Sequence, residues 1–115
     1  MPEASFSVSR ANPRFSFIAE AEVLGLRDKT RIVARVSELS ARGCYVDTID
    51  PVDIGTELRL RIRYGGSTCE VPCKVIYTHS GYGMGVLFGE MTPAQISPIK
   101  SWLDELARKQ AGNQR

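Results

Sequence analysis

The segment "LRLRIRY" (58–64) places the strictest limit on the fold, because apolar or aromatic side chains alternate with arginine at every position. A period of two is typical of a β-strand with one buried and one solvated face. We therefore expect Arg59, Arg61 and Arg63 to face water. The glycine pair 65–66 predicts a two-residue hairpin turn, so the next strand should run antiparallel to this one. The side chains expected to face a core are Leu58, Leu60, Ile62 and Tyr64.

Five further segments have strand patterns, with alternating or β-branched residues between clusters of turn formers. Six short strands separated by turns predict a mainly β protein, either an antiparallel barrel or a sandwich. The 115-residue chain is long enough for one such domain. The five segments are residues 15–23, 30–39, 44–48, 68–78 and 84–88.

The periodicity changes from two to that of a helix near the C-terminus. Thr92 and Gln95 have the spacing of a capping box at a helix start. Pro98 is expected to interrupt this helix, which predicts a short turn at 93–97 and a main helix from 98 to about 109. The apolar side chains expected to lie on the barrel are Ile96, Ile99, Leu103 and Leu106, together with Trp102.

Charge and composition disfavour several classes of protein. The net charge of +2 is far below that of a strongly basic nucleic-acid-binding domain. No stretch approaches the roughly 20 apolar residues that cross a bilayer, so no membrane insertion is expected. The first residues do not resemble a signal peptide, and three cysteines do not suggest a disulfide framework. These features predict a cytoplasmic protein.

The residues that could carry catalysis or bind a metal are few. His79 is the only histidine and lies in a predicted turn, so a Ser–His or Cys–His pair would depend on it alone; we assign no catalytic residue and expect no enzyme. Cys69 and Cys73 share strand parity with Val75 and Tyr77, a face expected to lie in the core. Their spacing lacks the close cysteine pairs of structural zinc sites, so neither metal nor cofactor is predicted.

Two arginines, Arg10 and Arg14, precede the first predicted strand in "RANPR". Their spacing of four would place them on one face of a helix, but Pro13 between them disfavours a helix. We expect residues 1–14 to form a flexible arm, and residues 15–115 to form the barrel with its C-terminal helix as a single domain. Taken alone, the two arginines also fit a solvated basic tail.

The segment "SELSARGCYV" contains a second group of polar residues at a turn. Along an extended strand Glu38 and Ser40 point to the same side. Gly43 would permit a positive backbone angle or let a ligand approach the main chain. Taken alone, this pattern also fits a polar strand edge and an ordinary turn.

Taken together, the Arg10-x-x-x-Arg14 arm, the Glu38-x-Ser40-x-x-Gly43 turn, "DIGTELRLRI" and "GMGVLF" resemble the PilZ domain family over residues 9–108. The resemblance implies a six-stranded antiparallel β-barrel of the split-barrel type with a C-terminal α-helix. It implies a bacterial second-messenger receptor that binds cyclic di-GMP and relays it, through ordering of the arm, to an unidentified effector protein of motility, biofilm or secretion machinery. The ligand-binding residues that it implies are Arg10, Arg14, Glu38, Ser40 and Gly43.

The chemistry of the ligand matches these residue types. A guanidinium donates two parallel hydrogen bonds to guanine O6 and N7 or to phosphate oxygens, while a carboxylate and a hydroxyl accept from the guanine N–H edge. Glu38 departs from the Asp or Asn of the family and reaches about 1.5 Å further, which is expected to weaken binding. Tyr82 is the main aromatic residue without inward parity, which makes it a candidate for a secondary ligand contact.

Two alternative functions remain open from the sequence. One is a PilZ-like protein-interaction module that no longer binds cyclic di-GMP, which the substitution at Glu38 would favour. The other is a small-barrel nucleic-acid binder that uses the arginine stripe at 59–63, although such a stripe is also the ordinary solvated face of an amphipathic strand.

Overall fold

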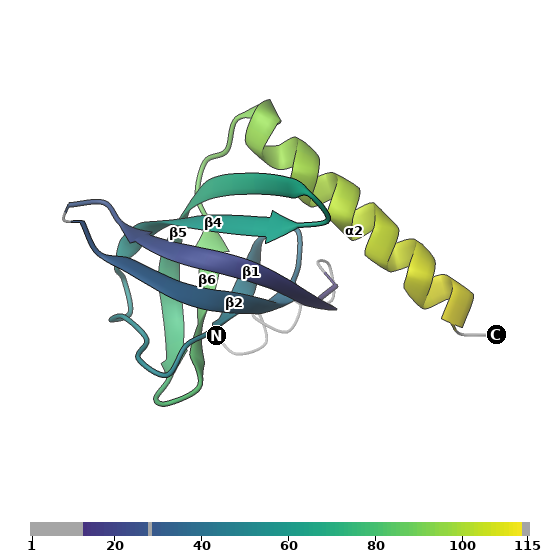
Figure 1. The fold of residues 1–115 in the computed structure, drawn as a ribbon. Helices are drawn as coiled ribbons and strands as arrows, with labels where there is room; N and C mark the ends of the chain where they lie inside the picture. The colour runs from purple at the N-terminus through teal and green to yellow at the C-terminus, as the bar shows by residue number, and fades with distance from the viewer. Residues whose placement is uncertain (1–12, 28, 114–115) are drawn as a thin grey trace, which may run out of the picture.

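The computed structural model describes residues 13–27 and 29–113, which form a closed six-stranded antiparallel barrel and a C-terminal helix. The strands follow one another around the barrel in the order β1-β2-β3-β6-β5-β4 (Figure 1). The barrel and helix predicted from the sequence are confirmed. The proposed arm lies outside the described residues, apart from positions 13 and 14, and stays a prediction. The elements are β1 (Phe15–Gly25), β2 (Arg31–Leu39), β3 (Gly43–Asp47), β4 (Glu57–Tyr64), β5 (Ser67–His79), β6 (Gly83–Phe88) and α2 (Pro93–Asn113).

The alternation in β4 has the predicted orientation. Leu58, Leu60 and Ile62 are buried in the barrel, and the arginines between them lie on the outer face. The hairpin to β5 turns through Gly65 and Gly66, whose φ angles of 58° and 83° are those that favour glycine. The sequence pattern therefore fixes both the orientation of this strand and its pairing with β5.

Three cysteines are buried in the barrel, which confirms the parity prediction for Cys69 and Cys73. Cys44, Cys69 and Cys73 are buried and free of disulfides. Burial raises the pKa of the Cys73 thiol to about 12, so this side chain stays protonated at neutral pH and packs as a small apolar group. Within residues 13–27 and 29–113, no group of three or more His, Cys, Asp and Glu side chains could hold a metal ion.

Helix α2 is continuous, so the predicted interruption at Pro98 is wrong. The predicted capping box is present: Thr92 N donates to Gln95 Oε1 at 2.8 Å, and Gln95 N donates to Thr92 Oγ1 at 3.2 Å. Gln95 Nε2 also donates to the Glu70 carbonyl of β5 at 2.9 Å. Because the first turn is held by its cap and by β5, the loss of one helical hydrogen bond at Pro98 does not end the helix.

The helix lies against one side of the barrel, next to β5 and β1 (Figure 1). Ile99 and Trp102 are buried at this contact. The Trp102 ring lies 5.5 Å from the ring of Phe17 and 5.7 Å from that of Tyr64, between ring centroids. Leu103 and Leu106 pack against the core as well, so the predicted apolar stripe closes the core beside β1 except at Ile96, which lines a surface hollow. In the part of the chain that the structure describes, no helix has the length and apolar character needed to cross a bilayer.

A bulge in β5 moves Tyr77 away from the core. Val75 pairs with Val86 and Tyr77 pairs with Gly85, so Ile76 is an extra residue in the ladder. One extra residue inverts the alternation of a strand. Tyr77 therefore lies on the outer face, beside Gly85, and its predicted inward orientation is wrong.

Candidate binding site

Two of the sequence-predicted ligand residues meet directly on the outer face of the barrel. Arg14 Nη1 lies 3.2 Å from Glu38 Oε1, and the two side chains are 48% and 44% exposed. Arg14 immediately precedes β1, and Glu38 lies near the end of β2. Residue Arg10, the predicted partner of Arg14, lies outside the described residues. The structure thus brings one predicted arginine and the predicted carboxylate together at an accessible place.

Ser40 shapes the turn between β2 and β3. Its Oγ accepts from the backbone N–H groups of Arg42 and Gly43, both at 3.3 Å, and donates to the Gly43 carbonyl at 3.2 Å. The Ser40 backbone N–H donates to the same carbonyl at 2.9 Å. A serine is favoured here because its hydroxyl satisfies backbone groups in a tight turn. Contact between this hydroxyl and a ligand stays a prediction.

Gly43 is required by the neighbouring strand. A Cβ at this position would overlap the Val86 carbonyl oxygen and would lie 3.3 Å from Leu87 Cα. The φ of Gly43 is not positive, so of the two reasons expected for a glycine at this position, a positive backbone angle does not apply. The absence of a side chain lets β3 and β6 lie close together beneath the turn.

Tyr82, the predicted secondary contact, lies elsewhere on the barrel. It is 77% exposed in the turn between β5 and β6. Its carbonyl accepts from Thr48 N at 3.0 Å, just beyond the end of β3. The β2–β3 turn lies at the other end of β3, about 13 Å away at the usual rise per residue. The structure therefore does not bring Tyr82 together with Ser40 and Gly43.

Sequence reasoning missed a cluster of aromatic rings beside Glu38. Tyr45 pairs with Glu38 across the β2–β3 ladder, and its hydroxyl lies 2.9 Å from His79 Nδ1. Tyr77 lies next to both rings. Burial raises the pKa of the Tyr45 phenol, and the neighbouring acidic groups raise it further. The glycine alternation in "GMG" (83–85) could have indicated that neighbouring strands hold large outward-facing side chains.

The sequence profile of the PilZ domain family matches residues 9–105. This chain belongs to the PilZ domain family. The matched range contains the Arg14–Glu38 pair, the β2–β3 turn and the whole barrel. No curated protein sequence matches the chain.

Solved PilZ structures share the fold at low sequence identity. The PilZ domain of CeSA from a cellulose-synthesizing bacterium is 18% identical, with a TM-score of 0.68 over 82% of this chain and 97% of that one. The PilZ domain of YcgR from Escherichia coli, solved with c-di-GMP, is 14% identical, with a TM-score of 0.71 over 89% of this chain and 94% of that one. The Bacillus subtilis inhibitor of motility, MotI/DgrA, is 18% identical with a TM-score of 0.71 over 89% of this chain, and this chain spans 51% of that protein.

The arginine stripe of this PilZ domain is neutralised by carboxylates. Arg61 lies 2.8 Å from Glu22 and 2.9 Å from Glu70. Arg59 also contacts Glu70, at 3.2 Å. Hydrogen bonding to Arg31 and the charges of the nearby arginines lower the pKa of Glu22, which keeps this carboxylate ionised at neutral pH. A face of alternating charges attracts a phosphate backbone far less than a row of free arginines would, so the geometry does not favour nucleic-acid binding there.

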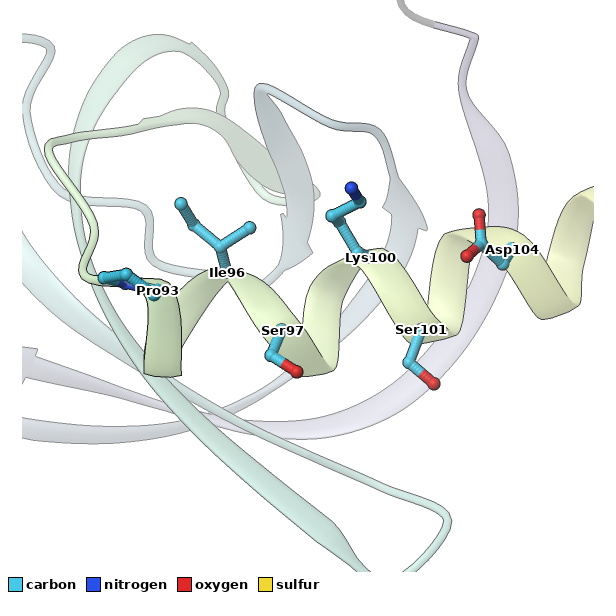
Figure 2. A pocket seen from close by; sticks show the side chains of 6 residues that line it. All are labelled: Pro93, Ile96, Ser97, Lys100, Ser101 and Asp104. Atoms are coloured by element: carbon cyan, nitrogen blue, oxygen red, sulfur yellow. The ribbon is translucent and has the colours of Figure 1, made fainter.

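A shallow hollow follows the first half of helix α2 (Figure 2). All the side chains that line it come from the helix itself, with Ile96 and Lys100 on one side and Ser97 and Ser101 on the other. No predicted ligand residue contributes to it. The lining residues are Pro93, Ile96, Ser97, Lys100, Ser101 and Asp104.

Proposed function

We propose that this PilZ domain is a non-enzymatic receptor for cyclic di-GMP and binds it between the N-terminal arginines and the β2–β3 turn. The observation that carries the proposal is the exposed Arg14–Glu38 pair, which lies beside that turn in a chain of this family. The c-di-GMP in the structure of the YcgR PilZ domain supports the choice of ligand. The receptor is proposed to act in the cytoplasm, where bacterial signalling nucleotides are made.

The charges of the site suit a guanine nucleotide. Arg14 can donate to guanine O6 and N7 or to a phosphate, and Arg10 is proposed to supply the second guanidinium. Glu38 can accept from the N–H groups of guanine, which adenine cannot offer in the same arrangement. Arg14 and Glu38 lie 3.2 Å apart, so a donor and an acceptor for guanine are next to each other at this site.

Isothermal titration calorimetry with cyclic di-GMP tests this function directly, with GTP and cyclic di-AMP as controls. We expect saturable binding of cyclic di-GMP, and weaker or no binding of the controls. A corresponding rise in Tm should accompany binding, because a ligand of the native state stabilises it. Absence of heat at millimolar cyclic di-GMP would instead favour a PilZ interaction module that has lost the ligand, which the glutamate at position 38 makes the main alternative.

The signal is proposed to pass to a partner protein through ordering of residues 1–14. Saturating cyclic di-GMP should slow amide hydrogen exchange in residues 5–14 while leaving the barrel strands nearly unchanged, because the backbone amides of the strands are already hydrogen-bonded within the barrel. Hydrogen exchange read by mass spectrometry measures this. Binding by calorimetry without any change in the exchange of these residues would contradict the relay and leave the receptor function intact.

Shortening the acidic side chain by Glu38→Asp should leave cyclic di-GMP affinity equal or raise it. Aspartate withdraws the carboxylate by about 1.5 Å, which loosens its ion pair with Arg14 and frees the guanidinium for the ligand. Loss of an exposed pair should change stability by less than about 1 kcal/mol. Calorimetry of the variant measures the affinity, and Glu20→Asp, which shortens the carboxylate facing Arg63 at 3.5 Å, is the matched control. A clear loss of affinity in Glu38→Asp alone would show that the longer side chain is needed.

A further inference from the structure

Large apolar side chains are exposed at the end of the barrel opposite to the β2–β3 turn. Ile49 and Ile54 belong to the loop between β3 and β4 and are 85% and 63% exposed. Tyr82, in the turn between β5 and β6, is 77% exposed. This loop and this hairpin lie on the side of the barrel away from helix α2 (Figure 1). Apolar side chains that are exposed close to one another mark interaction sites.

Backbone hydrogen bonds hold the β3–β4 loop against the β5–β6 hairpin. Thr48 N donates to the Tyr82 carbonyl at 3.0 Å, which places Ile49 next to the turn of the hairpin. Further along the loop, Gly55 N donates to the Val75 carbonyl of β5 at 2.7 Å. Because the loop is attached to the hairpin near both of its ends, its exposed side chains have defined positions beside β5 and β6.

The local structure of the loop explains why its isoleucines are not in the core. Val52 packs against the core and is partly buried, so it is the loop residue that fills the inward position. Thr56 N donates to the Asp53 carbonyl at 3.1 Å, and the φ of Gly55 is 92°. These two features define a tight turn with Ile54 at its tip. The side chain of Ile54 is therefore directed away from the barrel.

The same loop is acidic. Residues 47–57 contain four carboxylates and no lysine or arginine. Asp47 lies 2.8 Å from Arg35, whereas Asp50 and Asp53 make no ion pair within residues 13–27 and 29–113. Each of these two aspartates is adjacent in sequence to an exposed isoleucine, so apolar side chains and negative charge share one surface. The barrel-end surface is defined as Ile49, Asp50, Asp53, Ile54 and Tyr82.

We propose that the barrel-end surface binds a basic segment of a partner protein, with apolar side chains between its lysines or arginines. The sign of the charge decides among the possible occupants. A second copy bound through the same surface about a two-fold axis would bring the aspartates of the two copies together, which is unfavourable. Anionic lipid and nucleic acid are repelled for the same reason. A basic segment with apolar side chains complements both features of the surface.

Amide NMR spectra of the isotope-labelled protein test this proposal in the absence of cyclic di-GMP. The probe is a short synthetic peptide that alternates lysine and leucine. We expect saturable shifts centred on residues 48–54 and 80–83, and none with a peptide that alternates glutamate and leucine. Raising the salt concentration should weaken binding, since salt screens exposed charges. Shifts centred elsewhere on the barrel, or no shifts, would overturn the proposal.

Substitutions at exposed positions locate the contact without removing core side chains. Ile49→Ser should weaken binding of the lysine peptide by about 5-fold or more, the loss typical of an important interface residue. Val33→Ser is the matched control, because Val33 is 80% exposed on β2 and outside the barrel-end surface; its affinity should not change. Asp50→Asn combined with Asp53→Asn should weaken binding and reduce its salt dependence. Equal losses in Ile49→Ser and Val33→Ser would contradict a localised contact.

The same variants identify any other occupant. Dimers in analytical ultracentrifugation that Ile49→Ser abolishes would assign the surface to a second copy and overturn the proposal. Co-sedimentation with phosphatidylglycerol vesicles that Ile49→Ser abolishes would assign it to a membrane and overturn it as well. The proposal goes beyond the receptor function and does not depend on it, because Arg14 and Glu38 lie outside the barrel-end surface. Failure of cyclic di-GMP to bind would therefore leave this inference standing.

Discussion

Gly43→Ala is expected to lower the free energy of unfolding of the domain by about 1–3 kcal/mol, which corresponds to about 4–12 °C in Tm. The new methyl group would overlap the Val86 carbonyl oxygen and would lie 3.2 Å from Val86 C. These atoms are backbone of the paired strand β6, so no side-chain rotation relieves the overlap. The β3–β6 ladder must separate locally, and hydrogen bonds beneath the β2–β3 turn weaken. Thermal unfolding followed by circular dichroism measures the effect.

Gly89→Ala is the matched control for this loss of stability. A Cβ at Gly89 would meet its nearest neighbour, in Pro72, at 3.6 Å, which is ordinary van der Waals contact. Its φ is not positive, so alanine fits, and the reduced entropy of the unfolded chain should leave stability equal or slightly higher. Similar Tm values for the two variants would show that β3 and β6 tolerate a side chain at position 43 and would contradict the close approach of these strands.

Arg14→Ala is expected to lower cyclic di-GMP affinity by about 1.5–3 kcal/mol, or about 10- to 150-fold. The variant removes a charged donor to guanine or phosphate. It also leaves the negative charge of Glu38 without its paired cation, next to a ligand that carries two negative charges. Stability should change by less than about 1 kcal/mol, because Arg14 is half exposed and its ion pair lies at the surface. Calorimetry and thermal unfolding of the same preparation separate the two effects.

Arg63→Ala provides the comparison for Arg14→Ala. Arg63 is also an exposed arginine in a surface pair with a glutamate, at 3.5 Å, but it belongs to the β4 stripe. The variant removes the same charge from the domain without touching the proposed site. Equal losses of affinity in both variants would indicate general attraction of an anion, and a larger loss in Arg63→Ala would move the ligand to the arginine stripe.

The barrel could be predicted from sequence because its signals are local and repeated. The alternation of β4 and the glycine pair at 65–66 specify one strand face and one hairpin within about ten residues, and the other strands repeat the pattern. The continuous helix through Pro98 could not be predicted this way. Its first turn is held by Glu70, a residue on a distant strand, and tertiary contacts of this kind override local propensity.

The candidate site was only partly predictable for the same reason. The residue types at positions 14 and 38 led to the proposed binding site, and the structure places the two side chains in contact. The outward orientation of Tyr77 depends on the bulge at Ile76, which depends in turn on the register with β6. The need for glycine at position 43 arises from β6 as well. A single extra residue inverts a strand face, and nothing in the local sequence marks where it will occur.

The most direct test of cyclic di-GMP binding at this site is a titration of the isotope-labelled domain followed by amide NMR spectra. Saturable shifts concentrated at Arg14, Glu38 and the β2–β3 turn, with little change along the β4 arginines, are the result predicted. Shifts confined to β4, or unchanged spectra at millimolar ligand, would contradict the account.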